Sequence, residues 1–535
     1  MIGTRSWENG FFLQDDWRVT SRLTLNLGLR YDIYTWPVEV QDRQANFSVA
    51  TGAIDLANKN GVSRGFTDND YNNFGPRVGF AYRLTNDGKT VLRGGYGIFY
   101  FLDRGGISNQ LAQNPPFGGQ NSVSYAQGFR ITLSGALLCQ PACTQSQLNA
   151  TQATGALPSG DFTNLDLANP SGVSVISVLP SNVTPNVSQW NLQIQRQLGT
   201  NSSVSLAYVG DRGKNLTRNY NANQNLFDLP NSDPAHIRFT ELGSVTVQDN
   251  SGNSTYNSLQ AQYERRLTRG FQFLGSFAWS KTLDDACGDL DACAPQLYTD
   301  FKDEKGRSNI DQNYRLVLSS LYELPWGRGK HWGSNWSRPL DWVVGGWQLN
   351  GIYTLQSGLP FNVTVNGNPN ATRADLIGAP NVNTSFTPGG NDGTNIPYLA
   401  NPNSAFALPA ATLFPDGSVV FNALGTAGRD ILRGPGSSNI DLALFKNFAL
   451  GERFRLEARV QAYNLTNTPH FANPNSVLGQ WDVQGCNPAT SSQPCVNVDG
   501  VSKQLIANLN TSFGFVTSTQ PNSFRTVELG LRLTF

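Results

Sequence analysis

The chain has 535 residues, no net charge, 15% charged residues and a high content of glycine (53 residues) and aromatic residues (11%). Because nucleic-acid binding needs a basic surface, this neutral chain is not expected to bind DNA or RNA. The mean hydropathy of −0.33 does not exclude a membrane barrel, since barrel strands alternate apolar and polar residues and average to a polar value. No run approaches the roughly 18 apolar residues of a transmembrane helix.

Segments of about ten residues with period-two alternation recur along the chain, and this length suits a tilted strand that crosses a bilayer. In LTLNLGLRYDI, which begins at Leu23, the apolar residues share one face and Thr, Asn, Gly, Arg and Asp share the other. We predict strands, in chain order, at 7–17, 23–34, 74–84, 90–101, 187–198, 203–211, 255–267, 271–283, 313–324, 345–358, 438–449, 453–466 and 523–535.

The connections between these thirteen strands alternate between short turns and long loops. The long loops are predicted at 35–72, 102–186, 212–254, 284–312, 359–437 and 467–522. Short turns on one side and long loops on the other are typical of bacterial outer-membrane barrels, whose long loops face the outside of the cell. The connection between strands 313–324 and 345–358 is the longest of the short set. A soluble β-sandwich also has alternating strands, but it gives no reason for this segregation of loops.

The six cysteines fall into three close pairs, and all three pairs lie in predicted long loops. The pairs are Cys139 with Cys143, Cys287 with Cys293, and Cys486 with Cys495. Such local pairs predict three disulfide-closed loops in an oxidising compartment, on the same side that loop length assigns to the outside. Zinc is the alternative, but no pair has C-x-x-C spacing and no histidine lies nearby.

These patterns predict an all-β protein, an antiparallel transmembrane β-barrel with long extracellular loops and outer-membrane lipid against its apolar face. The final strand, TVELGLRLTF, ends on an aromatic, Phe535, with Leu531 and Leu533 on the lipid side. A bacterial single-chain barrel normally has an even number of strands. Thirteen strands therefore predict that an odd number of further strands precedes Met1.

Six stretches of the chain occur in a recognisable order. They are NFGPRVGFAY (73–82), VSQWNLQIQRQL (187–198), YNSLQAQYERRLTRGFQFLGSFAWSKTLDD (256–285), YRLVLSSLYELPWGRGK (314–330), GRDILRGPGSSNIDLALFKNF (428–448) and YNLTNTPHFANPN (463–475). Together they resemble the C-terminal barrel of TonB-dependent outer-membrane receptors, specifically the Oar-like group. The resemblance covers essentially the whole chain, and it identifies the scaffold rather than the ligand.

The resemblance implies a 22-stranded barrel filled by an N-terminal plug and energised through a TonB box by the TonB complex. Residues 1–535 then form a partial barrel domain of thirteen strands, with no plug domain and with the first strands absent. The last strand matches the outer-membrane assembly signal of the family. This implies that Leu531, Leu533 and Phe535 are recognised by the barrel-assembly machinery.

No catalytic or cofactor-binding site is expected, and the protein is not expected to be an enzyme. The three histidines are scattered, and the sequence shows neither a nucleophile–base set nor a metal cluster. One acidic stretch, LDDACGDLDAC, carries Asp284, Asp285, Asp289 and Asp291. Carboxylates at this density are a calcium candidate, whereas a solvated acidic loop is the default interpretation.

The leading hypothesis is the barrel portion of a plug-gated transporter for a large extracellular ligand, with loops 102–186 and 359–437 facing that ligand. A surface adhesin, a passive porin and a soluble carbohydrate-binding protein are the alternatives. Charged residues on the polar strand faces have a structural interpretation, as ion-pair and hydrogen-bond ladders, and a functional one, as guides for substrate. They include Arg30, Glu264, Arg266, Glu457, Arg459 and Arg532.

Overall fold

The computed structural model describes the chain in segments that are separated by gaps. These segments are 3–102, 107–117, 129–131, 137–139, 173–224, 237–240, 242–285, 295–366, 373–383, 396–449, 454–491, 493–521 and 523–535. In these segments strands greatly outnumber helices. No helix in the described part of the chain is long and apolar enough to cross a membrane.

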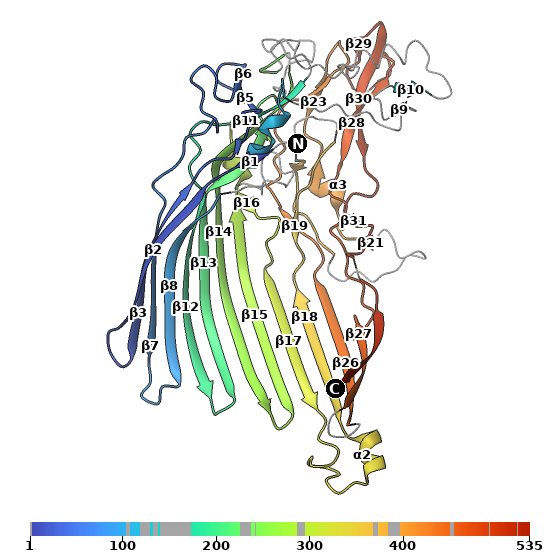
Figure 1. The fold of residues 1–535 in the computed structure, drawn as a ribbon. Coiled ribbons are helices and arrows are strands. Elements are labelled where there is room, and N and C mark those ends of the chain that lie inside the picture. Colours follow the sequence, from blue (N-terminus) through green and yellow to red (C-terminus); the bar gives the residue numbers. More distant parts are fainter. Residues whose placement is uncertain are drawn as a thin grey trace.

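One large sheet forms the body of the molecule, and its main path contains thirteen strands that follow one another in chain order (Figure 1). Each strand is antiparallel to its neighbours along this path. The strands are β2 (Glu8–Arg18), β3 (Leu23–Tyr34), β7 (Phe74–Arg83), β8 (Thr90–Tyr100), β12 (Asn186–Leu198), β13 (Ser202–Asn221), β14 (Leu242–Thr268), β15 (Phe271–Asp284), β17 (Tyr314–Glu323), β18 (Trp347–Gln356), β26 (Ser437–Ala449), β27 (Arg455–Tyr463) and β32 (Thr526–Thr534). Every predicted strand is present, and the all-β antiparallel architecture is confirmed.

Two strands are longer than the sequence predicts. β13 and β14 continue as a paired ribbon past the predicted ends at residues 211 and 255, and the ribbon contains register shifts after Gly213. Two short strands join the sheet in this outer region. β11 (Val173–Val178) pairs in parallel with β14, and β16 (Gly306–Arg307) pairs antiparallel with β15. The prediction stopped early because irregular pairing breaks the alternation on which it relied.

The exposure of apolar residues along the strands is opposite to that of a soluble protein. Leu529 on β32 is 80% exposed, and Leu13 on β2 is 78% exposed. The largest fully buried apolar side chains, such as Phe47 and Phe406, lie instead in the long loops. Large contiguous apolar surface is unfavourable in water, so the strands need lipid around them.

Strand register shows that the exposed apolar residues form one continuous face. Leu529 of β32 lies opposite Val460 of β27, which lies opposite Leu444 of β26, which in turn lies opposite Leu349 of β18. The neighbouring row, which starts at Glu528, places polar or small residues on the other face. Alternate residues of a strand point to opposite faces, so the sheet has an apolar outer face and a polar inner face.

The sheet is strongly curved, and the first and last strands of its path are its two edges (Figure 1). Among the described residues, β2 pairs only with β3, and β32 pairs only with β27. Unpaired backbone groups are not tolerated in hydrocarbon. In a bilayer, both edges therefore require a pairing partner.

The described parts of the long connections lie toward one end of the sheet, where they form a folded layer, whereas α2 (Arg338–Val344) lies at the opposite end (Figure 1). The layer contains short elements: β1 (Thr4–Arg5), β4 (Val38–Glu39), β5 (Ala45–Ser48), β6 (Ala53–Leu56), η1 (Ile107–Gln113), β9 (Phe129–Ile131), β10 (Leu137–Cys139), η5 (Lys302–Glu304), β19 (Pro360–Phe361), β20 (Asp375–Leu376), β21 (Ile396–Pro397), α3 (Pro402–Ala405), β22 (Phe406–Ala407), β23 (Ala411–Leu413), β24 (Val419–Phe421), β25 (Leu432–Arg433), β28 (Gly479–Gly485), β29 (Val496–Val498), β30 (Val501–Leu509) and β31 (Phe515–Val516).

Two apolar clusters give this loop layer its own cores. One cluster contains Phe406, Phe421 and Leu478, and the other contains Phe47 and Val245. Each cluster joins segments that are far apart in the sequence. The long loops are therefore packed against one another, and the layer can present a defined surface.

Candidate functional site: the inner wall and the loop layer

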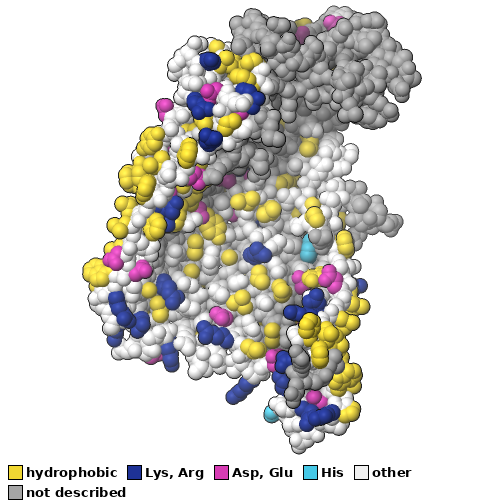
Figure 2. Space-filling model, in the orientation of Figure 1, with side chains coloured by type: hydrophobic (Ala, Val, Ile, Leu, Met, Phe, Trp, Pro, Cys, Tyr) yellow, Lys and Arg dark blue, Asp and Glu magenta, His cyan; other side chains and the backbone are white. Residues whose placement is uncertain are grey.

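The inner face of the sheet is a wall of amides, small residues and a few charges. On β12 the inward positions are Asn191, Gln193 and Gln195, and on β14 they include Gln260 and Gln262. In Figure 2 the hollowed face of the sheet is largely white, the colour of uncharged polar side chains and backbone, with scattered charged groups. Such a wall hydrogen-bonds with water or with a polar segment of protein.

Glycines on the inner face of β3, β7 and β8 create a shallow cavity of about 310 Å³. Gly28, Gly79 and Gly95 line its floor, and the guanidinium carbon of Arg77 lies 4.6 Å from the centroid of the Phe99 ring beside it. A second cavity of about 330 Å³ lies further along the wall, over β12 to β17, and is lined mainly by glutamines, serines and alanines. Both of these cavities are open recesses in the described part of the wall.

Five of the six charged residues that the sequence assigned to the polar faces lie on the inner face of the sheet by register, namely Arg30, Glu264, Glu457, Arg459 and Arg532. The sixth, Arg266, lies in a register shift near the end of β14. Within the described residues, Arg30 is the one member of this set that forms an ion pair, with its Nε 2.8 Å from Oδ1 of Asp32. The side chain of Arg459 lies over Gly530 on the adjacent strand. Within the described residues the other five form no ion pair, so the ion-pair part of the structural interpretation is not found for them.

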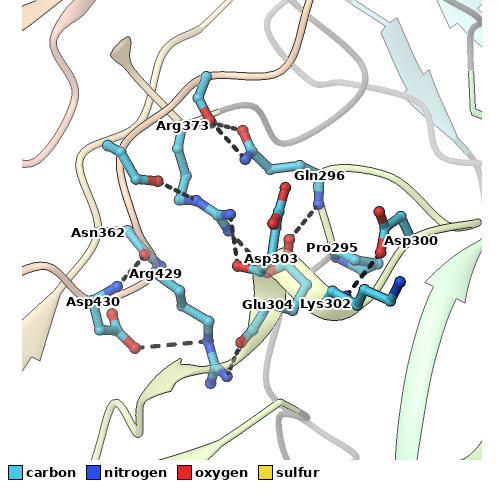
Figure 3. A network of polar contacts seen from close by, with 12 residues as sticks. Pro295, Gln296, Asp300, Lys302, Asp303, Glu304, Asn362, Arg373, Arg429 and Asp430 are labelled. Atoms are coloured by element: carbon cyan, nitrogen blue, oxygen red, sulfur yellow. Dashed lines mark hydrogen bonds and ion pairs between the residues drawn. The ribbon is translucent and has the colours of Figure 1, made fainter. Parts of the chain in front are cut away.

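A buried polar network ties the loop layer together above the wall (Figure 3). The Nη1 atom of Arg373 lies 2.9 Å from Oε2 of Glu304, and its Nε donates to the carbonyl of Ala427 at 2.8 Å. The side-chain oxygen of Gln296 accepts a hydrogen bond from the Arg373 backbone N–H at 2.7 Å. These contacts join loop 285–313 to loop 357–436, so each loop fixes the position of the other.

Arg429 extends the same network toward the sheet. Its Nη1 lies 2.5 Å from a carboxylate oxygen of Asp284 and donates to the Glu304 carbonyl at 3.1 Å. The neighbouring Asp430 is buried, and its backbone N–H donates to the side-chain oxygen of Asn362 at 2.7 Å. Burial raises the pKa of the Asp430 carboxyl to about 6, and the nearby Arg429 partly opposes this rise. The network therefore contains a group that titrates within a mildly acidic range.

The structure gives the two described members of the acidic stretch protein partners. Asp284 pairs with Arg429, and Asp285 accepts hydrogen bonds from the backbone and side-chain N–H groups of Asn253 at 2.6 and 3.2 Å. Asp289 and Asp291 lie outside the described residues. Within the described part of the chain, no group of three or more His, Cys, Asp or Glu residues is arranged to hold a metal ion.

The structure contains one of the three predicted disulfides, Cys486–Cys495, with the Cα atoms 6.1 Å apart. It closes the segment that leads from β28 to β29 in the loop layer. Cys143, Cys287 and Cys293 lie outside the described residues, as does the side chain of Cys139. The assembly-signal residues stand on the outer face of the β32 edge, where Leu531 is 77%, Leu533 54% and Phe535 87% exposed.

Sequence reasoning missed the buried loop network. Arg373, Glu304 and Arg429 are single charges in loops of irregular sequence, and nothing in their spacing links them. The stretch GRDILRG, which holds Arg429 and Asp430, carries the family resemblance but gives no sign of a buried network. A weak signal does exist, because charged residues are sparse in this chain and a charge between apolar loop residues is expected to be paired.

An apolar outer face, a polar inner wall and long loops confined to one end define a bacterial outer-membrane β-barrel protein. The sequence profile of the family described as "Outer membrane beta barrel domain" matches residues 1–528, and the chain belongs to that family. The protein is located in the bacterial outer membrane. No curated protein matches the sequence significantly.

Solved structures of outer-membrane transporters are similar to this chain at low identity. The transporter YddB from Escherichia coli is 10% identical, with a TM-score of 0.43, over 99% of this chain and 45% of its own. The siderophore receptor PiuA from Acinetobacter baumannii is 8% identical, with a TM-score of 0.41, over 99% of this chain and 43% of its own. This chain thus spans less than half the length of these two transporters.

Proposed function

We propose that this chain is the barrel portion of a TonB-dependent transporter of the Oar-like group, which moves a large ligand across the outer membrane. The observation that carries the proposal is the inner wall. Its amides, glycines and unpaired arginines form a broad, hydrated concave surface of the kind that a removable plug can contact without permanent burial of charge. The six family-like stretches, from NFGPRVGFAY to YNLTNTPHFANPN, support the assignment to the Oar-like group.

In this proposal, a plug domain and a further odd number of strands are encoded before residue 1. Those strands pair with β2 and β32 and close the barrel, because neither edge can remain unpaired in hydrocarbon. The TonB complex acts on the part that contains the plug. The barrel-assembly machinery recognises the exposed β32 edge with Leu531, Leu533 and Phe535. The chain itself performs no catalysis.

The loop layer supplies the ligand-facing surface. Its apolar cores and the Arg373–Glu304 ion pair hold the described parts of loop 357–436 in place, so these parts offer a preformed surface for recognition. A wide surface built from several loops suits a large ligand. Within the described residues the cavities of the inner wall are shallow, which argues against a small ligand enclosed by this chain alone.

The test begins with the DNA upstream of the codon for Met1. An open reading frame that encodes a plug, a TonB box and further alternating strands is expected, and an in-frame stop codon would contradict the proposal. The whole protein is then compared in cells with and without an active TonB complex. Uptake that requires the complex is expected, whereas steady ion conductance of the whole protein in a planar bilayer identifies a passive porin. Surface attachment without either activity identifies an adhesin.

A further inference from the structure

The turn between β17 and β18 differs from every other turn at its end of the sheet. The other turns on this side contain a few residues, whereas this one covers residues 324–346 and includes α2. Residues 326–347 contain five of the eleven tryptophans in the chain: Trp326, Trp332, Trp336, Trp342 and Trp347. We call residues 324–346 the tryptophan-rich turn. This turn is longer and richer in tryptophan than the connection of two strands requires, which indicates a further function.

Hydrogen bonds give the tryptophan-rich turn a defined fold. A carboxylate oxygen of Asp341 accepts the backbone N–H of Arg328 at 2.6 Å, which ties the first half of the turn to α2. The Gly327 N–H donates to the Trp332 carbonyl at 2.9 Å, and the Trp332 N–H donates to the Pro325 carbonyl at 2.9 Å. The turn therefore presents its exposed side chains in fixed positions.

The tryptophan-rich turn is attached to the lipid-facing side of the sheet. The Trp342 ring lies 4.8 Å from the ring of Phe448, and the ammonium group of Lys446 donates to the Gly345 carbonyl. Lys446 and Phe448 belong to the same face of β26 as Leu444, which lies in the apolar outer row. The turn therefore sits at the rim of the outer face, where lipid hydrocarbon gives way to headgroups on the short-turn side.

A cavity of about 790 Å³ lies within the tryptophan-rich turn, lined by Trp326, Trp342 and three basic side chains. The basic residues are Arg328, Lys330 and Arg338, and all three are exposed. Lys330 pairs with Glu323 at 2.8 Å. The guanidinium groups of Arg328 and Arg338 have no hydrogen bond or ion pair with any described residue. Asp341 is the one acidic residue in the turn, so its formal charge is positive.

We propose that the tryptophan-rich turn binds an anionic phospholipid of the periplasmic leaflet. The phosphate lies in the cavity beside Arg328 and Arg338, and the exposed Trp332, Trp342 and Val343 insert into the headgroup boundary. Three observations select lipid over a protein partner. The turn is continuous with the lipid-facing surface, it has the aromatic and basic composition of an interfacial segment, and its free guanidinium groups complement a phosphate. A phosphatidylglycerol-type headgroup therefore fits better than a zwitterionic one.

The experiment measures lipid retention by the whole natural protein that contains this chain, because both edges of the sheet need their pairing partners in a bilayer. The protein is folded into nanodiscs of phosphatidylcholine with a minor fraction of phosphatidylglycerol, released into mild detergent, and examined by native mass spectrometry. The test variant is Arg328→Gln/Arg338→Gln. A matched control, Arg22→Gln/Arg269→Gln, removes two exposed arginines from other short turns. Only variants that keep the strand signal in circular dichroism and the heat-modifiable gel mobility of the parent chain are compared.

We expect the parent chain and the control to retain phosphatidylglycerol in preference to phosphatidylcholine, and the test variant to lose this preference by about tenfold. If the test and control variants lost the preference for phosphatidylglycerol equally, the preference would come from the total positive charge of the short turns and not from this cavity. That result would overturn the proposal. No preference in the parent chain, or full displacement of the lipid by inorganic phosphate at constant ionic strength, would also overturn it. Because this readout involves no transport, it remains valid if the proposed function fails.

Discussion

Arg373 and Glu304 are 69 residues apart in the sequence and form a buried ion pair, with Nη1 and Oε2 separated by 2.9 Å. The pair joins two different loops. The two side chains are only 6% and 8% exposed. Removal of one partner leaves the other charge buried without compensation, which typically costs about 3–5 kcal/mol. The ion pair is therefore a strong determinant of how the loop layer is arranged.

We predict that Arg373→Met destabilises the loop layer by about 3–5 kcal/mol while the thirteen-strand sheet stays folded. Hydrogen exchange of the loop amides in detergent micelles measures the local change. Lys302→Met is the matched control, because Lys302 is exposed in the same short helix as Glu304. Combining Arg373→Met with Glu304→Leu is expected to restore part of the loss. Unchanged exchange in Arg373→Met would show that the pair does not hold the loops.

The buried Asp430 predicts a pH dependence. Its pKa is raised from 3.8 to about 6 by burial, so the folded state keeps a proton that the unfolded state releases between these values. The stabilising contribution is fully present below about pH 4 and is lost as the pH rises through about 6, on the order of 2–3 kcal/mol. Asp430→Asn is expected to flatten this part of the profile, whereas the exposed control Asp303→Asn leaves it unchanged. An identical profile in both variants would remove Asp430 as the cause.

The Cys486–Cys495 disulfide predicts a local effect on β28, β29 and β30. A disulfide stabilises chiefly by restricting the unfolded chain, and a short loop of this kind contributes about 2–3 kcal/mol. Cys486→Ser/Cys495→Ser is expected to accelerate hydrogen exchange in these three strands and to leave β12 to β18 unaffected. Faster exchange throughout the main sheet would instead show that the disulfide supports the whole fold.

The two faces of a strand are expected to differ in how well they tolerate a charged substitution, because one face contacts lipid and the other contacts water. Leu318 at the middle of β17 lies in register with Gly275 and Tyr353 on the outer face, and its neighbour Ser319 lies on the inner face. Leu318→Arg is expected to lower the free energy of unfolding in lipid vesicles by about 2–4 kcal/mol, whereas Ser319→Arg is tolerated. Guanidinium-induced unfolding of the two variants provides the comparison. Equal losses would contradict the assignment of lipid to one face.

The main sheet could be predicted because the pattern that defines each strand lies within the strand's own sequence. In a bilayer, an antiparallel strand with one face in lipid and the other in water must alternate, as Leu192, Gln193, Ile194 and Gln195 do on β12. The outer ribbon of β13 and β14 was missed because register shifts interrupt its alternation and because its packing partners come from distant parts of the chain. Buried Val245 and Val247 alternate there, but β11 and the β5 region supply their partners from distant sequence.

The site was predictable only in outline. The polar rows of the wall follow from the same alternation, yet the first cavity depends on how glycines of different strands come together. Gly79 lies opposite Gly95, whereas Gly28 lies in the adjacent inward row, opposite Arg77. The ion-pair ladder on the wall was not found among the described residues. Glu457 and Arg532 lie directly opposite each other on β27 and β32 but form no ion pair. A matching register therefore does not by itself bring the charged ends of two long side chains together. Arg373 and Glu304 meet only through tertiary packing, which no local pattern encodes.

The most direct test of the account is the environment of successive residues on one central strand. Nitroxide labels are placed singly at Leu192, Gln193, Ile194 and Gln195, and the whole protein that contains this chain is studied in lipid vesicles. We predict that labels at Leu192 and Ile194 are accessible to oxygen dissolved in the bilayer, and that labels at Gln193 and Gln195 are accessible to a water-soluble nickel reagent. Accessibility of all four labels to the water-soluble reagent alone would contradict a membrane barrel.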